Sequence, residues 1–312
     1  MPVWCDHPYI RRMLSADQQA AAALALWDAD QTKQSIAPLT ESYPDIDVVD
    51  AYEIQLANIR KRLDAGALIR GHKVGLSAKA MQNMLGVHEP DYGHLLDDMF
   101  VDEGSSIPMS RFCQPRAEIE VAFVLGQRLQ GPGVTVADVV RATDYVLPSI
   151  EIVDSRVTDW KIKIQDTVAD NASSAALVLG GRPTQLTDVD PALIGATLRK
   201  NGEVVETGCS GAVLGNPVIA VAWLANKVAR FGVTLEPGHV IGQMDAIFCR
   251  NVLIYFSQAA RRKAVEIFYE TLAPGGVLCL GHSESLLNAD TPFEALSTPA
   301  GILYKKRRRA ST

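Results

Sequence analysis

The 312-residue sequence lacks the patterns that mark several common classes of protein. No apolar run approaches the roughly 20 residues needed to cross a bilayer, and no apolar leader of the secretory type opens the chain. The five cysteines are an odd number without Cys-x-x-Cys spacing, which is typical of a reducing compartment. We therefore expect a cytoplasmic protein.

Charge and histidine patterns exclude further classes. The net charge of −6 is modest and is spread along the chain, so we expect no nucleic-acid or membrane surface. The exception is a run of five basic residues at 305–309, interpreted as a solubilising tail, with a nucleic-acid or lipid contact as the alternative. The six histidines show no His-x-x-x-His spacing, so His72 and His94 are interpreted as packing or surface residues.

The hydrophobic content of 47% supports a packed core, and the periodicity predicts an α+β protein. The first 66 residues are predicted to be helical, and the clearest helix begins at Asp47 and ends at Gly66. Strands and short helices follow. The strands are expected at 68–76, 118–125, 146–153 and 175–179, and the short helices at 78–85 and 136–143.

Two later segments carry strong local signals. Asn201 and Gly202 separate two short strands, 196–200 and 203–207, and predict a type I′ hairpin because both turn positions need positive φ. Asn216 followed by Pro217 predicts the start of a helix, which Gly232 ends.

Three carboxylates in strand-like segments carry the chemistry. Side chains alternate between the two faces of a strand, so Glu118 and Glu120 share one face and Ile119 and Val121 share the other. Buried like charges repel unless a cation offsets them, and magnesium and manganese prefer oxygen ligands. With Glu151 in the next predicted strand, the pattern indicates a divalent-metal site. The alternative is a solvated acidic face.

Five motifs occur in a specific order around these carboxylates: residues 71–77 (GHKVGLS), 89–93 (EPDYG), 114–120 (QPRAEIE), 151–156 (EIVDSR) and 166–174 (DTVADNASS). Together they resemble the 2-keto-4-pentenoate hydratases and 2-oxo-3-hexenedioate decarboxylases of the fumarylacetoacetate hydrolase superfamily. The resemblance runs from about residue 10 to Ile241. It implies a helical N-terminal region on a mixed β-roll core that lacks its C-terminal strands.

The same resemblance implies the chemistry. The expected reaction is metal-dependent hydration of a small 2-hydroxydienoic acid, with Mg²⁺ or Mn²⁺ held by Glu118, Glu120 and Glu151. Lys73 and Asp91 match catalytic positions of the family, although by themselves they could be a strand-edge lysine and a turn aspartate. The family also implies a homo-oligomer.

The last of the five motifs, residues 166–174, places further residues near the expected site. Asp166, Asn171 and Ser173 are second-line candidates for contact with the substrate. The resemblance does not decide which of the three makes that contact.

The remainder of the chain has a different character. Residues 245–256 (DAIFCRNVLIYF), 272–276 (LAPGG) and 280–286 (LGHSESL) resemble the C-terminal part of a chemotaxis-receptor glutamate methyltransferase. That resemblance implies a partial α/β methyltransferase fragment with strands near 246–249, 277–280 and 302–304 and a helix near 258–272. Arg250 and Tyr255 match positions at the rim of that family's active site.

The sequence therefore predicts two parts: a hydratase-like domain at 1–241, and a methyltransferase C-terminal fragment with a basic tail at 242–312. The second part lacks the glycine-rich strand–turn–helix that an S-adenosylmethionine site needs. Three hypotheses for function follow. They are hydration of 2-hydroxypenta-2,4-dienoate in aromatic or sterol ring catabolism, decarboxylation of 2-oxo-3-hexenedioate, and an inactive fusion or receptor methyltransferase fragment.

Overall fold

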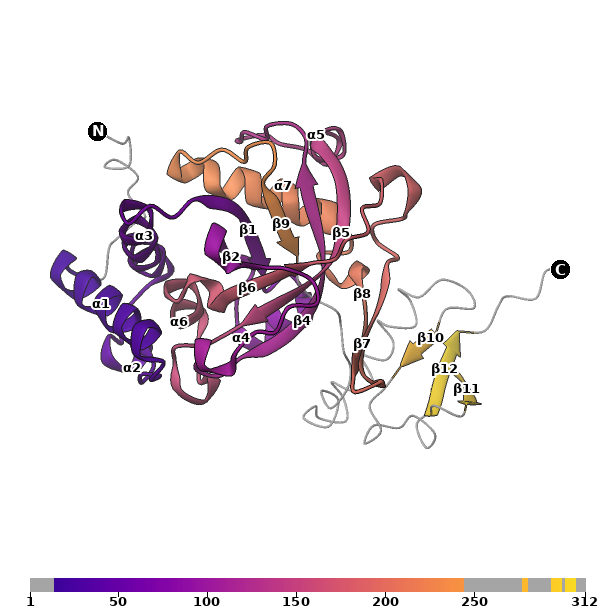
Figure 1. Ribbon diagram of the computed structural model, residues 1–312, viewed down its shortest axis with the longest axis horizontal. Coiled ribbons are helices and arrows are strands. Elements are labelled where there is room, and N and C mark those ends of the chain that lie inside the picture. Colours follow the sequence, from indigo (N-terminus) through magenta and orange to yellow (C-terminus); the bar gives the residue numbers. More distant parts are fainter. Residues whose placement is uncertain (1–13, 244–276, 280–292, 299–300, 307–312) are drawn as a thin grey trace. The chain divides into compact units, whose positions relative to one another are not determined.

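The structure is a computed structural model that describes residues 14–243, 277–279, 293–298 and 301–306 (Figure 1). The chain forms two compact units, Met1–Ala246 and Ile247–Thr312. The first unit contains the described helices and the large sheet. None of the described helices is both long and apolar enough to span a bilayer.

Three helices open the first unit: α1 (Ala16–Thr32), α2 (Leu39–Ser42) and α3 (Val48–Asp64). Helix α3 begins at the position predicted, where the Asp47 carboxylate caps it by accepting from the Asp50 amide. Gly66, with φ of 99°, lies just beyond the end of the helix, as expected. The buried face of α3 includes Ala51 and Ile54 because α1 and α6 (Ile164–Ala169) both pack against this helix.

A seven-stranded mixed sheet forms the centre of this unit, in the order β2-β1-β9-β4-β5-β6-β3. The pairs β1–β9 and β3–β6 are parallel, and the other neighbours are antiparallel. The strands are β1 (Ile69–Gly75), β2 (Asp91–Leu96), β3 (Phe100–Val101), β4 (Arg116–Leu125), β5 (Thr143–Val153), β6 (Ser174–Leu179) and β9 (Val240–Gln243). The mixed α+β core predicted from the resemblance is therefore present.

The short elements follow their local signals. Helices α4 (Lys79–Leu85), α5 (Val136–Ala142) and α7 (Pro217–Val228) lie where they were predicted, and Asn216 caps α7. Strands β7 (Gly195–Lys200) and β8 (Glu203–Cys209) form the expected hairpin. Its turn residues Asn201 and Gly202 have φ of 54° and 86°.

The sequence did not predict β2, β3 and β9 as strands. Strand β2 begins at Asp91 and contains Gly93 and His94, residue types that do not favour strands. It is nevertheless fully buried because it pairs with β1 on one side and lies under helices. Strand β9 has only four residues, too few for a periodic signal, and it exists because β1 and β4 accept it between them.

Helices cover one face of the sheet. Tyr52 of α3 stacks on Tyr92 of β2 at 4.8 Å between ring centroids, and α7 packs against β1 and β9. The apolar side chains of this layer merge into the main hydrophobic cluster of the unit. His72 and His94 are both buried, so the packing alternative predicted for them is the one observed.

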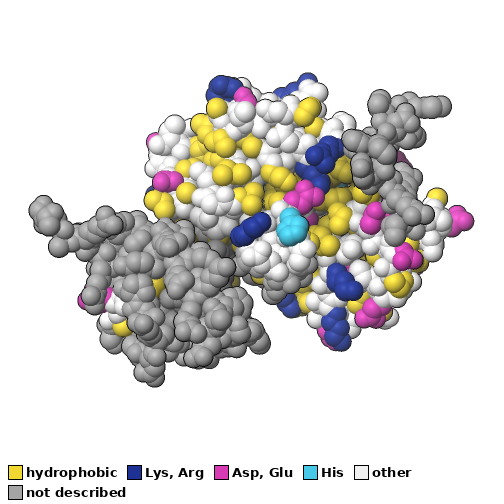
Figure 2. Space-filling model, turned by 180° about the vertical axis from the view of Figure 1, so that it is seen from behind, with side chains coloured by type: hydrophobic (Ala, Val, Ile, Leu, Met, Phe, Trp, Pro, Cys, Tyr) yellow, Lys and Arg dark blue, Asp and Glu magenta, His cyan; other side chains and the backbone are white. Residues whose placement is uncertain are grey.

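The surface view supports the even distribution of charge seen in the sequence. On the face shown in Figure 2, basic and acidic side chains of the described residues are interspersed among apolar ones, and no extended single-sign patch forms.

The described part of the second unit is a three-stranded antiparallel sheet in the order β10-β12-β11. Its strands are β10 (Val277–Cys279), β11 (Phe293–Thr298) and β12 (Gly301–Lys306). Strands were expected near 277–280 and 302–304, whereas β11 was not predicted. The expected strand at 246–249, the helix at 258–272, Arg250 and Tyr255 lie outside the described residues.

Candidate active site

The pairing of β4 with β5 sets the geometry of the carboxylates. In this antiparallel register Glu118 lies directly opposite Glu151, and Glu120 lies opposite Ser149. Directly opposed residues project to the same face of a sheet, as do residues two apart on one strand. Two neighbouring strands therefore bring Glu118, Glu120 and Glu151 to one point. One ligand oxygen from each of the three lies within 4.8 Å of the others.

This carboxylate cluster (Glu118, Glu120 and Glu151) is withdrawn from water. Glu120 and Glu151 are buried and Glu118 is partly buried. Within the described part of the chain, the four carboxylate oxygens of Glu120 and Glu151 accept no hydrogen bond. Burial and the neighbouring Glu151 charge raise the pKa of Glu120 well above its usual value.

The residues present fit a divalent cation. Buried acceptors without hydrogen bonds are costly in a folded protein, and a hard cation with oxygen ligands would satisfy them. Three converging carboxylates also supply the negative charge that such a cation needs. We find no second group of three or more potential ligands among the residues that the structure describes.

Glycines make room for these carboxylates. A Cβ atom built on Gly242 of β9 would lie 2.8 Å from Glu120 Oε2, closer than real Cβ contacts allow. A Cβ atom on Gly75 of β1 would lie 2.3 Å from Asp91 Oδ1 and 3.0 Å from Lys73 Nζ. A side chain at either position would displace the functional groups, so both glycines shape the site.

Lys73 and Asp91 lie on the paired strands β1 and β2. Gly75 is directly opposite Asp91, and Lys73 is two residues earlier on the same face of β1. The Lys73 ammonium donates to Ala172 O at 2.9 Å and lies 3.8 Å from Glu151 Oε2. Burial alone would lower the pKa of Lys73, but the negative charges of Glu151 and Asp91 outweigh it and raise that pKa. Lys73 is therefore a buried cation beside the carboxylate cluster.

The three second-line residues are engaged with protein groups. The Asp166 carboxylate accepts from the amide and hydroxyl of Thr40 and from the Lys163 amide, which joins α6 to α2. The Asn171 amide pairs with both backbone groups of His94. Ser173 Oγ lies 3.3 Å from Thr167 Oγ1. Each of these side chains therefore braces the fold, and contact with the substrate remains a prediction for all three.

Sequence reasoning missed Gly75, Gly242 and Ala172. The two glycines stand in strands, where glycine weakens the sheet unless something approaches it closely, and that was an available signal. Ala172 contributes only its carbonyl. No side-chain motif could have indicated it.

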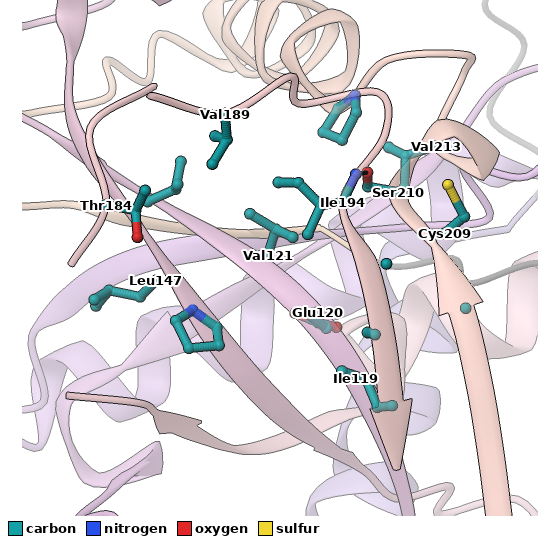
Figure 3. Close-up of a pocket in the computed structure, with 16 residues that line it drawn as sticks. Ile119, Glu120, Val121, Leu147, Thr184, Val189, Ile194, Cys209, Ser210 and Val213 are labelled. Atoms are coloured by element: carbon teal, nitrogen blue, oxygen red, sulfur yellow. Dashed lines mark hydrogen bonds between the residues drawn. The ribbon is translucent and has the colours of Figure 1, made fainter. Parts of the chain in front are cut away.

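An apolar pocket of about 190 Å³ is lined by Ile119 and Val121, which project from the face of β4 opposite to the carboxylates; Glu120 is the one charged residue among the described residues that line it. It is formed by β4, β5, the β7–β8 hairpin and the segment before α7. Val121 and Ile194 point toward one another across it (Figure 3). The pocket offers apolar surface beside the carboxylate strand.

Comparison with known proteins agrees with this geometry. Residues 72–243 match the family model described as fumarylacetoacetate (FAA) hydrolase C-terminal, more than half of the chain. The chain belongs to the fumarylacetoacetate hydrolase family. A 2-hydroxypent-2,4-dienoate hydratase of Pseudomonas putida is 50% identical over 209 residues, which cover 67% of this chain and 94% of that protein.

Other members of the family resemble the chain over a similar span. A 2-oxo-hept-4-ene-1,7-dioate hydratase of Escherichia coli is 44% identical over 70% of this chain and 84% of its own length. The solved structure of 4-oxalocrotonate decarboxylase from Pseudomonas putida G7, complexed with magnesium and adipate, aligns with a TM-score of 0.71 at 39% identity. The alignment covers 74% of this chain and 88% of the decarboxylase. Through its named relatives the chain is an enzyme of the hydro-lyase type.

The C-terminal resemblance also has a counterpart. Residues 233–302 match the family model of the CheR methyltransferase, SAM binding domain. The two matches overlap at residues 233–243, the segment that contains β9. The two matched ranges therefore meet at the strand that carries Gly242.

Proposed function

We propose that this protein hydrates 2-hydroxypenta-2,4-dienoate to 4-hydroxy-2-oxopentanoate, with Mg²⁺ or Mn²⁺ held by Glu118, Glu120 and Glu151. The supporting observation is the carboxylate cluster itself, in which the oxygens of Glu120 and Glu151 accept no hydrogen bond from the described residues and Glu151 adjoins the buried cation Lys73. The 50% identity to a dienoate hydratase supports the choice of substrate. The proposed context is the catabolism of aromatic or sterol rings.

The overall reaction adds one molecule of water. The enol proton leaves the 2-oxygen and a proton is added at C5, which gives a 2-oxo-3-enoate. Water then adds its hydroxyl to C4 and a proton to C3. The bound cation would supply Lewis-acid stabilisation of the negative charge that develops at the 2-oxygen.

Lys73 and Asp91 would carry the remaining steps. The Lys73 ammonium, fixed beside Glu151, would stabilise negative charge on the substrate's 2-oxygen. Asp91, at the start of β2, would carry a proton between the enol oxygen and the carbon chain and would orient the attacking water. Burial of the site would exclude other water molecules from the reactive enol.

Decarboxylation of 2-oxo-3-hexenedioate is the second candidate, and one observation favours it. A dicarboxylate needs a second cation, and Arg116 lies two residues before Glu118 on the same face of β4. The Arg116 guanidinium stacks over the Trp160 ring at 4.2 Å from the ring centroid, which holds it in place at the exposed end of the strand. A distal substrate carboxylate could pair with it.

For the whole chain we propose a hydratase-like domain at 1–241 joined to a methyltransferase C-terminal fragment at 242–312. We further propose that the protein is a cytoplasmic homo-oligomer. No methyl transfer is expected, because the sequence before residue 245 has no glycine-rich cofactor turn. An inactive fusion is the opposing hypothesis, since the junction falls beside the carboxylate cluster at Gly242.

The test follows the loss of ultraviolet absorbance of freshly generated 2-hydroxypenta-2,4-dienoate, with Mg²⁺, with a chelator, and with Glu151→Gln. Metal-dependent loss that disappears in the variant would support hydration. A folded protein that binds Mg²⁺ but leaves the dienoate unchanged would sink the proposal. Carbon dioxide release from 2-oxo-3-hexenedioate, reduced in Arg116→Gln, would favour decarboxylation instead.

A further inference from the structure

A short turn between α6 and β6 has an unusual backbone. Asn171, Ala172 and Ser173 have φ of 54°, 50° and 56°, so three consecutive residues other than glycine adopt the left-handed conformation. Such a run is sterically unfavourable for L-amino acids, and it persists only where the surrounding structure imposes it. The contacts of this turn show what imposes it.

The Asn171 side chain fastens the turn to β2. Its Oδ1 accepts from the His94 amide at 2.7 Å, and its Nδ2 donates to His94 O at 2.9 Å. The amide thus satisfies both backbone groups of one strand residue, as a neighbouring strand would do. The turn then lies directly on Gly93, where a Cβ atom would be only 2.3 Å from Asn171 O.

The ends of the turn are also fixed. On one side, Asp170 forms a buried ion pair with Arg156. On the other side, Ser173 O accepts from the Asp154 amide at 2.8 Å. The middle residue, Ala172, is thereby held with its carbonyl toward β1. That carbonyl accepts from Lys73 Nζ at 2.9 Å.

We infer that Asn171 is a positioning residue that acts through Lys73. Lys73 lies opposite Gly93 in the β1–β2 register, so the residue that Asn171 covers is the strand partner of Lys73. The Ala172 carbonyl accepts a hydrogen bond from the buried ammonium at 2.9 Å, a shorter distance than the 3.8 Å to the Glu151 oxygen. The Asn171 bridge therefore sets where that ammonium lies.

This inference rests on the proposed function, and it assigns Asn171 a role other than contact with the substrate. Loss of a positioning group misplaces a reacting group and lowers kcat, whereas loss of a substrate contact raises KM. The two roles can therefore be separated by kinetics.

The experiment compares three variants of the full chain in the Mg²⁺-dependent dienoate assay. Asn171→Gly removes the side-chain amide, but glycine still adopts the left-handed conformation readily. Asn171→Ala removes the amide and also disfavours that conformation. The matched control is Asn226→Ala, because Asn226 makes the same kind of bridge, to the amide and carbonyl of Val134, away from the site. All three should lower the melting temperature.

We expect kcat to fall by about 10- to 100-fold in both Asn171 variants, with KM within about 3-fold of wild type. Asn226→Ala should keep kcat within about 2-fold. An unchanged kcat in Asn171→Gly, or a change confined to KM, would overturn the inference. An equal fall of kcat in the Asn226→Ala control would also overturn it. Failure of the proposed function would look different, since wild type itself would then show no turnover.

Discussion

Two buried charged clusters lie in the same unit and differ in how their polar atoms are satisfied. The carboxylate cluster leaves the oxygens of Glu120 and Glu151 without hydrogen bonds within the described part of the chain. The second cluster, which we name the arginine clasp, consists of Asp154, Arg156 and Asp170, and it is saturated with hydrogen bonds.

The bonds of the arginine clasp tie together separate segments. Arg156 bonds to the Asp170 carboxylate through its backbone amide and Nε, and to Asp170 O through Nη2. Asp154 accepts from the amides of Cys113 and Gln114, just before β4 begins. Each cluster contains one residue from the same end of β5. Glu151 lies within the strand, and Asp154 lies three positions later, just after the strand ends.

The comparison shows that burial of charge alone does not identify a binding site. A cluster whose hydrogen bonds are complete stabilises the fold, and removal of one member leaves the others uncompensated. A cluster whose buried acceptors lack hydrogen-bond donors fits a ligand that the chain does not itself provide. The following experiments test this distinction.

The largest effect should come from Glu120→Gln. Turnover should fall by about 1000-fold or more, because the variant loses one of three charged ligands. Yet the metal-free protein should gain about 1 kcal/mol of unfolding free energy at neutral pH, since burial raises the pKa of Glu120 and ionisation is therefore costly in the folded state. The measurements are the dienoate assay and denaturant unfolding with and without Mg²⁺.

Glu236→Gln is the control for that variant, because Glu236 is partly exposed and pairs with Arg128 at the surface. Glu236→Gln should change neither turnover nor the unfolding free energy. A metal-free Glu120→Gln protein that is several kcal/mol less stable than wild type would mean that the carboxylate cluster is structural after all.

The arginine clasp, unlike the carboxylate cluster, should lose stability when one of its charged groups is replaced. Arg156→Met should lower the unfolding free energy by about 3–5 kcal/mol, whether or not Mg²⁺ is present, because Asp170 would remain buried without its partner. Urea denaturation measures this change. Arg141→Met, which breaks an exposed pair with Asp138, should have a far smaller effect, because solvent screens that pair. Equal losses in the two variants would contradict the comparison.

Acid should destabilise the fold through a buried histidine near the strained turn. Burial lowers the pKa of His94 from 6.5 to about 4, so the unfolded state binds a proton more readily between these values. Stability is therefore present above pH 6.5 and is lost as the pH falls toward 4, by up to about 3 kcal/mol from this group. The urea midpoint should fall less steeply with acid in His94→Gln than in wild type, whereas His88→Gln, a change of an exposed histidine, should leave the slope unchanged. The slope that remains in His94→Gln is expected from His72, because burial lowers the pKa of that histidine as well.

The smallest effect is expected from a steric change beside the carboxylate cluster, with no change of charge. Gly242→Ala should weaken Mg²⁺ binding by about 10-fold, about 1.4 kcal/mol, because the new methyl group would push against Glu120. Gly195→Ala is the matched control, since a Cβ atom on this strand glycine meets nothing closer than 4.0 Å. Titration calorimetry with Mg²⁺ compares the two. Equal affinities would show that Glu120 can move aside without loss.

Local signals predicted much of the fold. Asp47 and Asn216 began their helices as expected, and Asn201-Gly202 formed its hairpin, because each depends on bonds within a few residues. Strand β9 escaped prediction because its four residues gain their structure from two distant neighbours. Asp91 was open to interpretation as a turn residue for a similar reason, since only pairing with β1 makes it the start of a strand.

Alternation along a strand places Glu118 and Glu120 on one face whatever lies around them, so this feature follows from the amino-acid sequence alone. The motifs from which the family was inferred are also local. Three other features exist only in the folded chain: Glu151 lies opposite Glu118, Gly242 borders Glu120, and the Ala172 carbonyl accepts from the Lys73 ammonium. These contacts join segments from about 30 to about 120 residues apart. Their register depends on the packing of the whole sheet and its helices, not on any local preference.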